Sequence, residues 1–193
     1  MGKWLIQGGV IQPAPGEVVF PADIEAMLRA VSPERRVSFL ETWGWLGMIT
    51  VTARGTDGRY RSRETFHNII TTAGKNMIRS VLSGSTTDGA IRYLAMGNGT
   101  NAAQITDTAL QSEQFRKAVT AFNPSGLTDA QNVTRTVVAA SEATAFTTEE
   151  LGWFASPTAT ATANSGILIA RVLYHRAKSP TESLQVDRTD TYS

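Results

Sequence analysis

Residues 47–66 have the sequence GMITVTARGTDGRYRSRETF, and this stretch decides the fold class. Its first half, Gly47–Arg54, is rich in β-branched residues, whose side chains suit the pleated surface of a sheet. Thr56-Asp57-Gly58 supplies a turn, because glycine adopts backbone conformations that other residues avoid. Arg59–Phe66 then returns as a second strand. The stretch therefore predicts a β-hairpin.

The composition of the whole chain also favours β-structure. Its 193 residues include 25 threonines, and only 18% of the residues are charged. This length suits one domain with an appended arm, and it can bury a core without disulfides or metals. Eighteen Lys and Arg against seventeen Asp and Glu leave a formal net charge of +1. We therefore do not expect DNA as a partner.

The residue types that are missing exclude several kinds of site. The chain has no cysteine, so it has no disulfide, thiol nucleophile or cysteine-bound metal. Its two histidines, His67 and His175, lie far apart in the sequence and form no zinc-binding motif. No apolar run approaches the roughly 18 residues of a membrane span. We expect no catalytic residue, no cofactor, no metal and no membrane insertion.

The chain is expected to consist of an arm and one domain. Residues 1–41 hold four of the seven prolines and predict an extended N-terminal arm. Within it, the chain is expected to be extended through Val18–Phe20 and to form a short helix over Ile24–Ala30. The arm either packs on another molecule or folds back on its own domain. Residues 42–193 are expected to form a single β-sandwich-type domain.

Inside that domain, residues 42–84 continue from the hairpin into a helix. Apolar residues follow helical spacing over Ile69–Leu82, after Asn68, and Gly84 closes the helix. Residues 90–193 are expected to form the sandwich core. Its predicted strands are Ile91–Met96, Val133–Ala140, Ala143–Thr147, Ile167–Tyr174 and Ser183–Arg188, the last with Leu184 and Val186 facing inward.

Two connecting segments are less regular. Asp107–Val119 fits either a short helix or an irregular strand. Pro157–Ser165 consists of small residues, and we expect a mobile loop between strands.

Two motifs raise the question of chemistry. Gly97-Asn98-Gly99 follows a predicted strand, as in dinucleotide-binding turns, but no amphipathic helix follows to hold a pyrophosphate. A tight bend at the strand end is the better interpretation. Glu149 and Glu150 are adjacent on a predicted strand, so they point to opposite faces and do not form a carboxylate pair.

Tryptophans and arginines supply the candidate interface residues. Trp43 and Trp45 share one strand face, where they either pack in the core or, if exposed, anchor an interface. Arg59, Arg61 and Arg63 alternate along the return strand and so share one face, with Tyr60 on the other. That arginine face is solvated, pairs with a neighbouring subunit, or contacts phosphates.

A succession of short motifs carries a resemblance to a known family. These are FHNII (66–70), IRYLAMGNGT (91–100), DTALQSE (107–113), EELGWF (149–154) and GILIAR (166–171). In this order they resemble small structural proteins of tailed-bacteriophage virions, which are associated with tail fibres and baseplates. The similarity covers residues 66–189, and residues 1–65 have no counterpart in it.

The resemblance implies a mainly β fold, an antiparallel β-sandwich or jelly-roll-like module that assembles as a homo-oligomer without a catalytic site. It implies structural roles for the motif residues. Gly97 and Gly99 would shape a loop, Asp107 and Glu113 would order the segment that follows, Glu150, Gly152 and Phe154 would form a strand and corner, and Ala170 and Arg171 would lie on a central strand.

The expected function is that of a non-enzymatic structural component of the virion, assembled in the bacterial cytoplasm. Its partners would be other virion proteins at the tail, fibre or baseplate, and copies of itself. The alternatives are a head decoration protein, a collar or connector protein, or a module that binds a host-surface glycan.

Overall fold

The computed structural model describes residues 4–7, 10–13, 45–123 and 131–192. The chain divides into two compact units, Met1–Trp43 and Gly44–Ser193.

In the first unit, two short strands pair as an antiparallel hairpin. They are β1 (Trp4–Gln7) and β2 (Val10–Pro13). No sequence pattern noted above predicts this hairpin. The extended segment expected through residues 18–20 and the helix expected at 24–30 lie outside the described residues.

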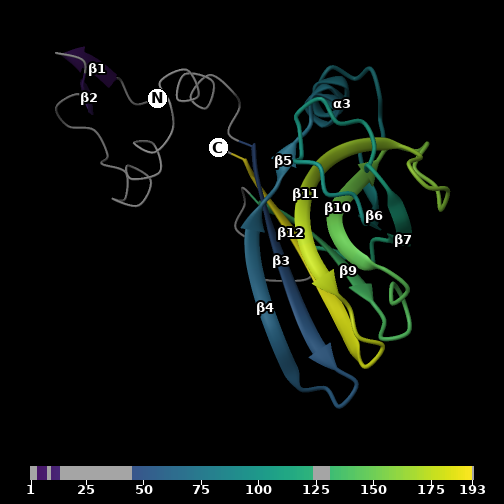
Figure 1. The fold of residues 1–193 in the computed structure, drawn as a ribbon. Helices are drawn as coiled ribbons and strands as arrows, with labels where there is room; N and C mark the ends of the chain where they lie inside the picture. The colour runs from purple at the N-terminus through teal and green to yellow at the C-terminus, as the bar shows by residue number, and fades with distance from the viewer. Residues whose placement is uncertain (1–3, 8–9, 14–44, 124–130, 193) are drawn as a thin grey trace. The chain divides into compact units, whose positions relative to one another are not determined.

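The second unit is mainly β, as predicted, with two antiparallel five-stranded sheets arranged as a sandwich (Figure 1). The first sheet has the order β5-β11-β10-β6-β7, with bounds Ile69–Ile70, Ile167–Ala177, Thr147–Ala155, Ile91–Gly97 and Glu113–Ala118. The second sheet has the order β4-β3-β12-β9-β8, with bounds Tyr60–His67, Trp45–Gly55, Glu182–Tyr192, Gln131–Val138 and Ala121–Phe122.

The predicted strands agree with this arrangement except at one place. The strand predicted over Ala143–Thr147 is wrong, because Ala143 has a positive φ of 52° and β10 spans Thr147–Ala155. The ambiguous segment Asp107–Val119 contains an irregular loop followed by β7, and no helix.

The helix α3 (Thr72–Leu82) lies at the end of the sandwich where β3 begins (Figure 1). It starts three residues later than predicted, because Ile69 and Ile70 pair with β11 as strand β5. Thr71 is the N-cap: its Oγ1 accepts a bond from the Gly74 N–H at 2.9 Å. None of the helices in the described part of the chain is long and apolar enough to cross a membrane.

Alternate residues of the strands fill the space between the two sheets. The inner faces contribute large apolar side chains that are at most 1% exposed: Ile49, Val51, Leu94, Met96, Leu151, Trp153, Ile169, Leu184 and Val186. The last two confirm the predicted alternation of the terminal strand. Burial of this much apolar surface is the main stabilising contribution in a chain without disulfides.

A second, smaller apolar cluster lies on the outer face of the first sheet. It contains Ala95, Leu110, Phe154, Ala159 and Leu168. Two connections contribute to it, the 98–112 loop between β6 and β7 and the 156–166 loop between β10 and β11.

Candidate functional site

A fully buried carboxylate holds the 98–112 loop. Glu150 stands on β10, and its side chain is 0% exposed. Its Oε1 accepts backbone bonds from Ser112 at 2.8 Å and from Gly99 at 3.2 Å, and its Oε2 accepts one from Gln111 at 3.1 Å. These donors lie near the two ends of the loop, so one carboxylate fixes both ends to the strand.

The fourth partner of Glu150 is Arg171 on the neighbouring strand β11. Arg171 Nε donates to Glu150 Oε2 at 2.8 Å, Nη1 donates to Asp107 Oδ2 at 2.8 Å, and Nη2 donates to the Asn101 carbonyl at 3.0 Å. Burial disfavours the charged guanidinium, but the hydrogen bonds and charges of Asp107 and Glu150 outweigh it and raise the pKa of Arg171. Arg171 therefore remains charged and ties the middle of the loop to the sheet.

Gly97 and Gly99 provide the space for this carboxylate. A Cβ atom at either position would lie 2.5 Å from Glu150 Oε1, closer than a side-chain atom can approach. The Gly-x-Gly motif is thus explained by the close approach of Glu150. The 98–112 loop contains no helix, so it offers no helix N-terminus for a pyrophosphate.

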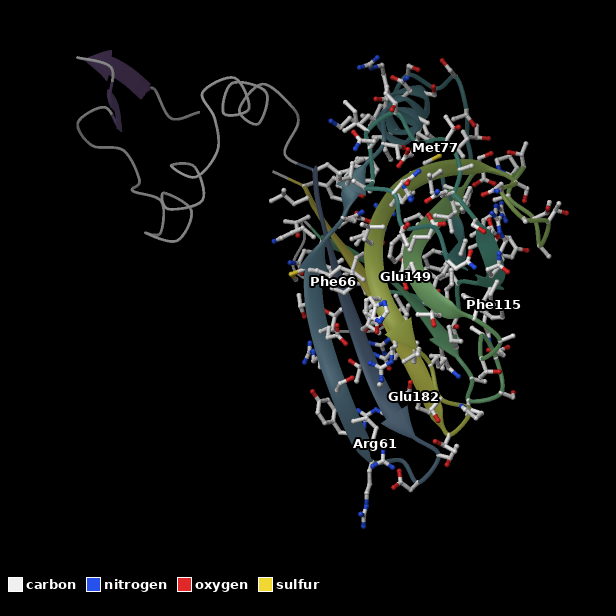
Figure 2. All side chains as sticks on the ribbon, viewed as in Figure 1. Arg61, Phe66, Met77, Phe115, Glu149 and Glu182 are labelled. Atoms are coloured by element: carbon white, nitrogen blue, oxygen red, sulfur yellow. The ribbon has the colours of Figure 1, made fainter. Side chains whose placement is uncertain are left out.

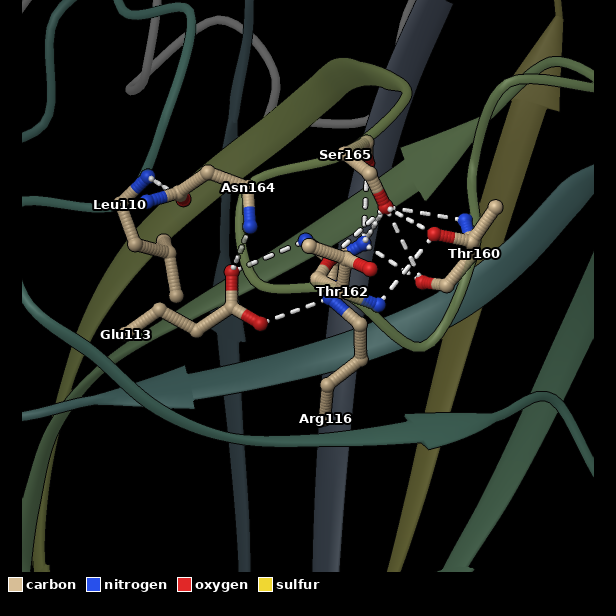
Figure 3. Close-up of polar contacts among 7 residues, drawn as sticks. All are labelled: Leu110, Glu113, Arg116, Thr160, Thr162, Asn164 and Ser165. Atoms are coloured by element: carbon tan, nitrogen blue, oxygen red, sulfur yellow. Dashed lines mark hydrogen bonds and ion pairs between the residues drawn. The ribbon is translucent and has the colours of Figure 1, made fainter.

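A second buried ion pair lies beneath the 156–166 loop (Figure 3). Arg116 and Glu113 on β7 form two parallel bonds of 2.6 and 2.9 Å, with side chains only 3% and 2% exposed. Arg116 Nη1 also donates to the carbonyls of Thr160 at 3.1 Å and Ser165 at 2.9 Å. The guanidinium carbon lies 4.1 Å from the centre of the Phe154 ring.

The 156–166 loop, which we expected to be mobile, is therefore held by specific contacts. Glu113 also accepts a bond from the Asn164 N–H at 2.8 Å. The Asn164 side chain in turn accepts one from the Leu110 N–H at 3.1 Å, which joins this loop to the 98–112 loop. Figure 3 shows the bonds that Leu110, Glu113 and Arg116 make to residues of this loop.

A third charged pair lies inside the sandwich. Arg188 and Asp190 stand on the inner face of β12 and are both 0% exposed. Asp190 Oδ1 accepts bonds from Arg188 Nη2 at 2.6 Å and from Trp45 Nε1 at 2.8 Å. The guanidinium lies 5.7 Å from the ring centres of Trp45 and Trp153. This pair draws the indole of Trp45 toward the interior.

The two candidate tryptophans can now be placed. Trp43 lies outside the described residues. Trp45 is half-buried and stacks on Tyr192, with ring centres 6.0 Å apart. It also lines a mainly apolar pocket of about 230 Å³, together with Phe122 and Met77. Trp45 thus packs partly on the core and partly beside this pocket.

The three candidate arginines do not form one stripe. The pairing of β3 with β4 shifts between Ala53 and Arg54, so that Tyr60 lies opposite Arg54. The prediction that Tyr60 faces away from the arginines is therefore wrong, since the extra residue reverses the alternation. Tyr60 shares the outer face with Arg63, which is paired with Thr52.

The other two arginines lie at the hairpin tip (Figure 2 labels Arg61). Arg61 lies against Gly55 and donates to Asp57 at 3.1 Å. Arg59 precedes β4 and is exposed, with its Nε 3.9 Å from the same carboxylate.

The remaining acidic and histidine residues do not converge. Glu149 faces His175 at 2.9 Å, and it does not join Glu150. Within the described ranges, no three His, Cys, Asp or Glu residues are grouped so that they could hold a metal ion.

The sequence singles out Glu150, Arg171 and Asp107 but does not predict that they meet. A signal exists for Arg171, which interrupts the otherwise apolar run 167–174. No family model, curated protein or solved structure matches this chain.

Proposed function

We propose that this chain is a non-enzymatic structural component of a tailed-phage particle, present in several copies and docked on neighbouring virion proteins. The observation that supports this best is the use made of its charged motif residues. Glu150, Arg171 and Asp107 bind the 98–112 loop and each other, and Glu113 and Arg116 bind the 156–166 loop. These charged groups hold the loops of a scaffold in place, as expected of a structural protein.

The position on the particle is part of the same proposal. A tail, fibre-base or baseplate position fits the resemblance carried by the motifs, and a head-surface or collar position is the alternative. The division into a short N-terminal unit and a larger sandwich unit supports either, because one unit can attach while the other remains outside.

Particle composition tests the proposal. Tailed-phage particles produced by the source of this sequence would be purified and washed at high salt, then analysed by quantitative mass spectrometry. We expect peptides of this chain in several copies per particle, together with antibody labelling at one defined site. An abundant host protein of similar size serves as the control for adsorption. Absence of the chain from washed particles would contradict the proposal.

A further inference from the structure

Strand β4 is a free edge of the second sheet. It ends the strand order β4-β3-β12-β9-β8, and among the described strands it pairs only with β3. Figure 1 shows it along one side of the sandwich. An edge strand of eight residues presents a row of backbone N–H and C=O groups that another strand can bind.

One hydrogen bond shows which backbone groups face this edge. The Asn68 N–H donates to the Gly47 carbonyl at 3.2 Å, and in an antiparallel pair such bonds recur at every second residue. Alternate residues of β4 therefore direct their backbone groups to β3, and the others direct them outward. The residues that face outward are Arg63, Thr65 and His67.

The side chains of these three residues stand on the outer face of the sheet, where they pair with Thr52, Thr50 and Met48 of β3. Arg54 and Tyr60 lie beside them on the same face. Within the described part of the chain, neither Arg54 nor Arg63 has a carboxylate within 4.0 Å. Among the described residues, the edge is thus bordered by two cations without a carboxylate partner, Arg54 and Arg63.

The carboxylates of the same hairpin are engaged elsewhere. Asp57 binds Arg61 at 3.1 Å, and Glu64 faces Arg176 at 3.4 Å on the other side of the sheet. Asp187 on β12 is held by two bonds from Arg135, of 2.7 and 2.9 Å. No acidic group of the described residues is left to neutralise this edge.

A second copy of the chain is a poor occupant of this edge. Two β4 strands related by a two-fold axis, in the registers that overlap most of their length, would place Arg63 opposite Arg63 or Glu64 opposite Glu64. Like charges directly opposite each other destabilise a strand pair. Charge repulsion therefore disfavours pairing between two copies of β4, whereas a strand of opposite charge meets no such repulsion.

From the free backbone groups and the unpaired cations, we infer that β4 binds an extended acidic segment of another protein as an added strand. Every second residue of the segment is acidic, and these carboxylates lie on the outer face of the sheet near Arg63. The residues between them are small or apolar and lie on the inner face, beside Phe66. The inference rests on the proposed structural role, since it states the chemistry of one docking partner. Backbone bonds supply affinity, and the charges supply specificity and register.

Binding of a labelled peptide to the full chain tests the inference. The peptide has glutamate at alternate positions with valine or threonine between them, and a lysine version is the control. We expect the acidic peptide alone to bind, and Arg63→Glu to weaken it by about tenfold or more. Arg79→Glu, an equal charge change on α3, should leave the affinity within about twofold, since exposed charges at a distance are screened.

A backbone substitution separates strand addition from simple charge attraction. Thr65→Pro removes the N–H that faces the edge, whereas Thr65→Ala keeps it, and proline is tolerated at edges. We expect Thr65→Pro to abolish binding and Thr65→Ala to retain it, with both variants folded by circular dichroism. Peptide addition should also slow amide hydrogen exchange at residues 63, 65 and 67.

Four results would overturn the inference. Two concern the peptide: the acidic peptide does not bind at millimolar concentration, or Thr65→Pro binds it as well as the wild type does. Two concern other occupants: duplex DNA binds through Arg63 whatever residue stands at position 65, or the chain forms a dimer that Thr65→Pro dissociates. The proposed function fails separately. If the peptide binds but the chain is absent from particles, only the proposed structural role is wrong. If the Thr65→Pro variant enters particles as the wild type does, only the inference about the β4 edge is wrong.

Discussion

Glu150 is a buried charge whose stability depends on its hydrogen-bond partners. Its carboxylate is fully buried and accepts four hydrogen bonds, three of them from backbone N–H groups of one loop. Removing one partner of a buried ion pair is far more costly than replacing a surface charge, because the remaining charge stays buried.

We predict that Glu150→Gln destabilises the protein by about 3–5 kcal/mol. The amide replaces an acceptor oxygen with a donor that faces other donors, and Arg171 loses one of its two carboxylates. Urea unfolding followed by circular dichroism measures this change. Glu149→Gln, the matched control on the same strand, should change stability by less than about 1 kcal/mol, because its partner His175 is exposed. A loss below 1 kcal/mol for Glu150→Gln contradicts the role given to this carboxylate.

The ion pair between Glu182 and Arg176 makes the stability of the fold depend on pH. Hydrogen bonds from Arg176, at 2.7 and 3.1 Å, hold the pKa of Glu182 below its usual value of 4.5. The folded state therefore binds fewer protons than the unfolded state in this range. The stabilisation is complete above about pH 4.5 and is lost as the pH falls through the pKa of the folded state.

We expect Glu182→Gln to reduce the fall in Tm between about pH 6 and pH 3. The variant lacks the group whose protonation breaks the ion pair. Thermal unfolding of the wild type and the variant across this pH range measures the effect. An unchanged slope in Glu182→Gln shows that other carboxylates control acid unfolding.

Among the elements, α3 depends on a glycine for its close contact with β11. A Cβ atom at Gly74 would lie 2.7 Å from the Ile169 carbonyl oxygen and 2.8 Å from its Cα. Both are backbone atoms of a strand that pairs on both sides, so they cannot move independently.

We predict that Gly74→Ala destabilises the protein by about 1–3 kcal/mol, although alanine is the better helix former. The helix must shift from the sheet to admit the methyl group. Asn76→Ala, two residues away on the exposed side of α3, should be neutral or slightly stabilising. Chemical unfolding compares the two variants, and equal effects would contradict the close contact.

The 156–166 loop offers a prediction about local opening. Arg116→Lys keeps the charge but loses the parallel bonds to Glu113 and those to the loop carbonyls. We expect amides of residues 160–165 to exchange hydrogen about tenfold faster, while those of β10 stay protected. Arg92→Lys, at an exposed ion pair with Asp88, is the control that should leave this loop unchanged.

The sequence predicts the elements better than their contacts. Alternation in β12 and the turn at Asp57-Gly58 act locally, so the strand, its buried face and the hairpin follow from them. Ile69 and Ile70 fit a helix by spacing, but pairing with β11 determines that they form a strand. Glu150 and Asp107 meet only because the sheet brings together residues far apart in the chain, which no local pattern contains.

At the scale of the whole molecule, the sandwich unit contains its own core and all three buried ion pairs described above. We therefore predict that a fragment of residues 44–193 folds alone, with a Tm within about 3 °C of the full chain, equivalent to about 1 kcal/mol at this size. Differential scanning calorimetry compares them. A fragment without a cooperative transition would show that residues 1–43 complete the fold.

The pairing of Trp45 with Tyr192 has a mechanical consequence. The first residue of β3 and the last residue of β12 are neighbours in the ladder, so these two strand ends meet at one end of the sheet. Tension applied between them opens the ladder one rung at a time, starting at the rung that the stacked rings and the Trp45–Asp190 bond reinforce. The hairpin tip lies at the far end of this ladder and the two loops lie on the other sheet, so all three keep their geometry while the first rungs open.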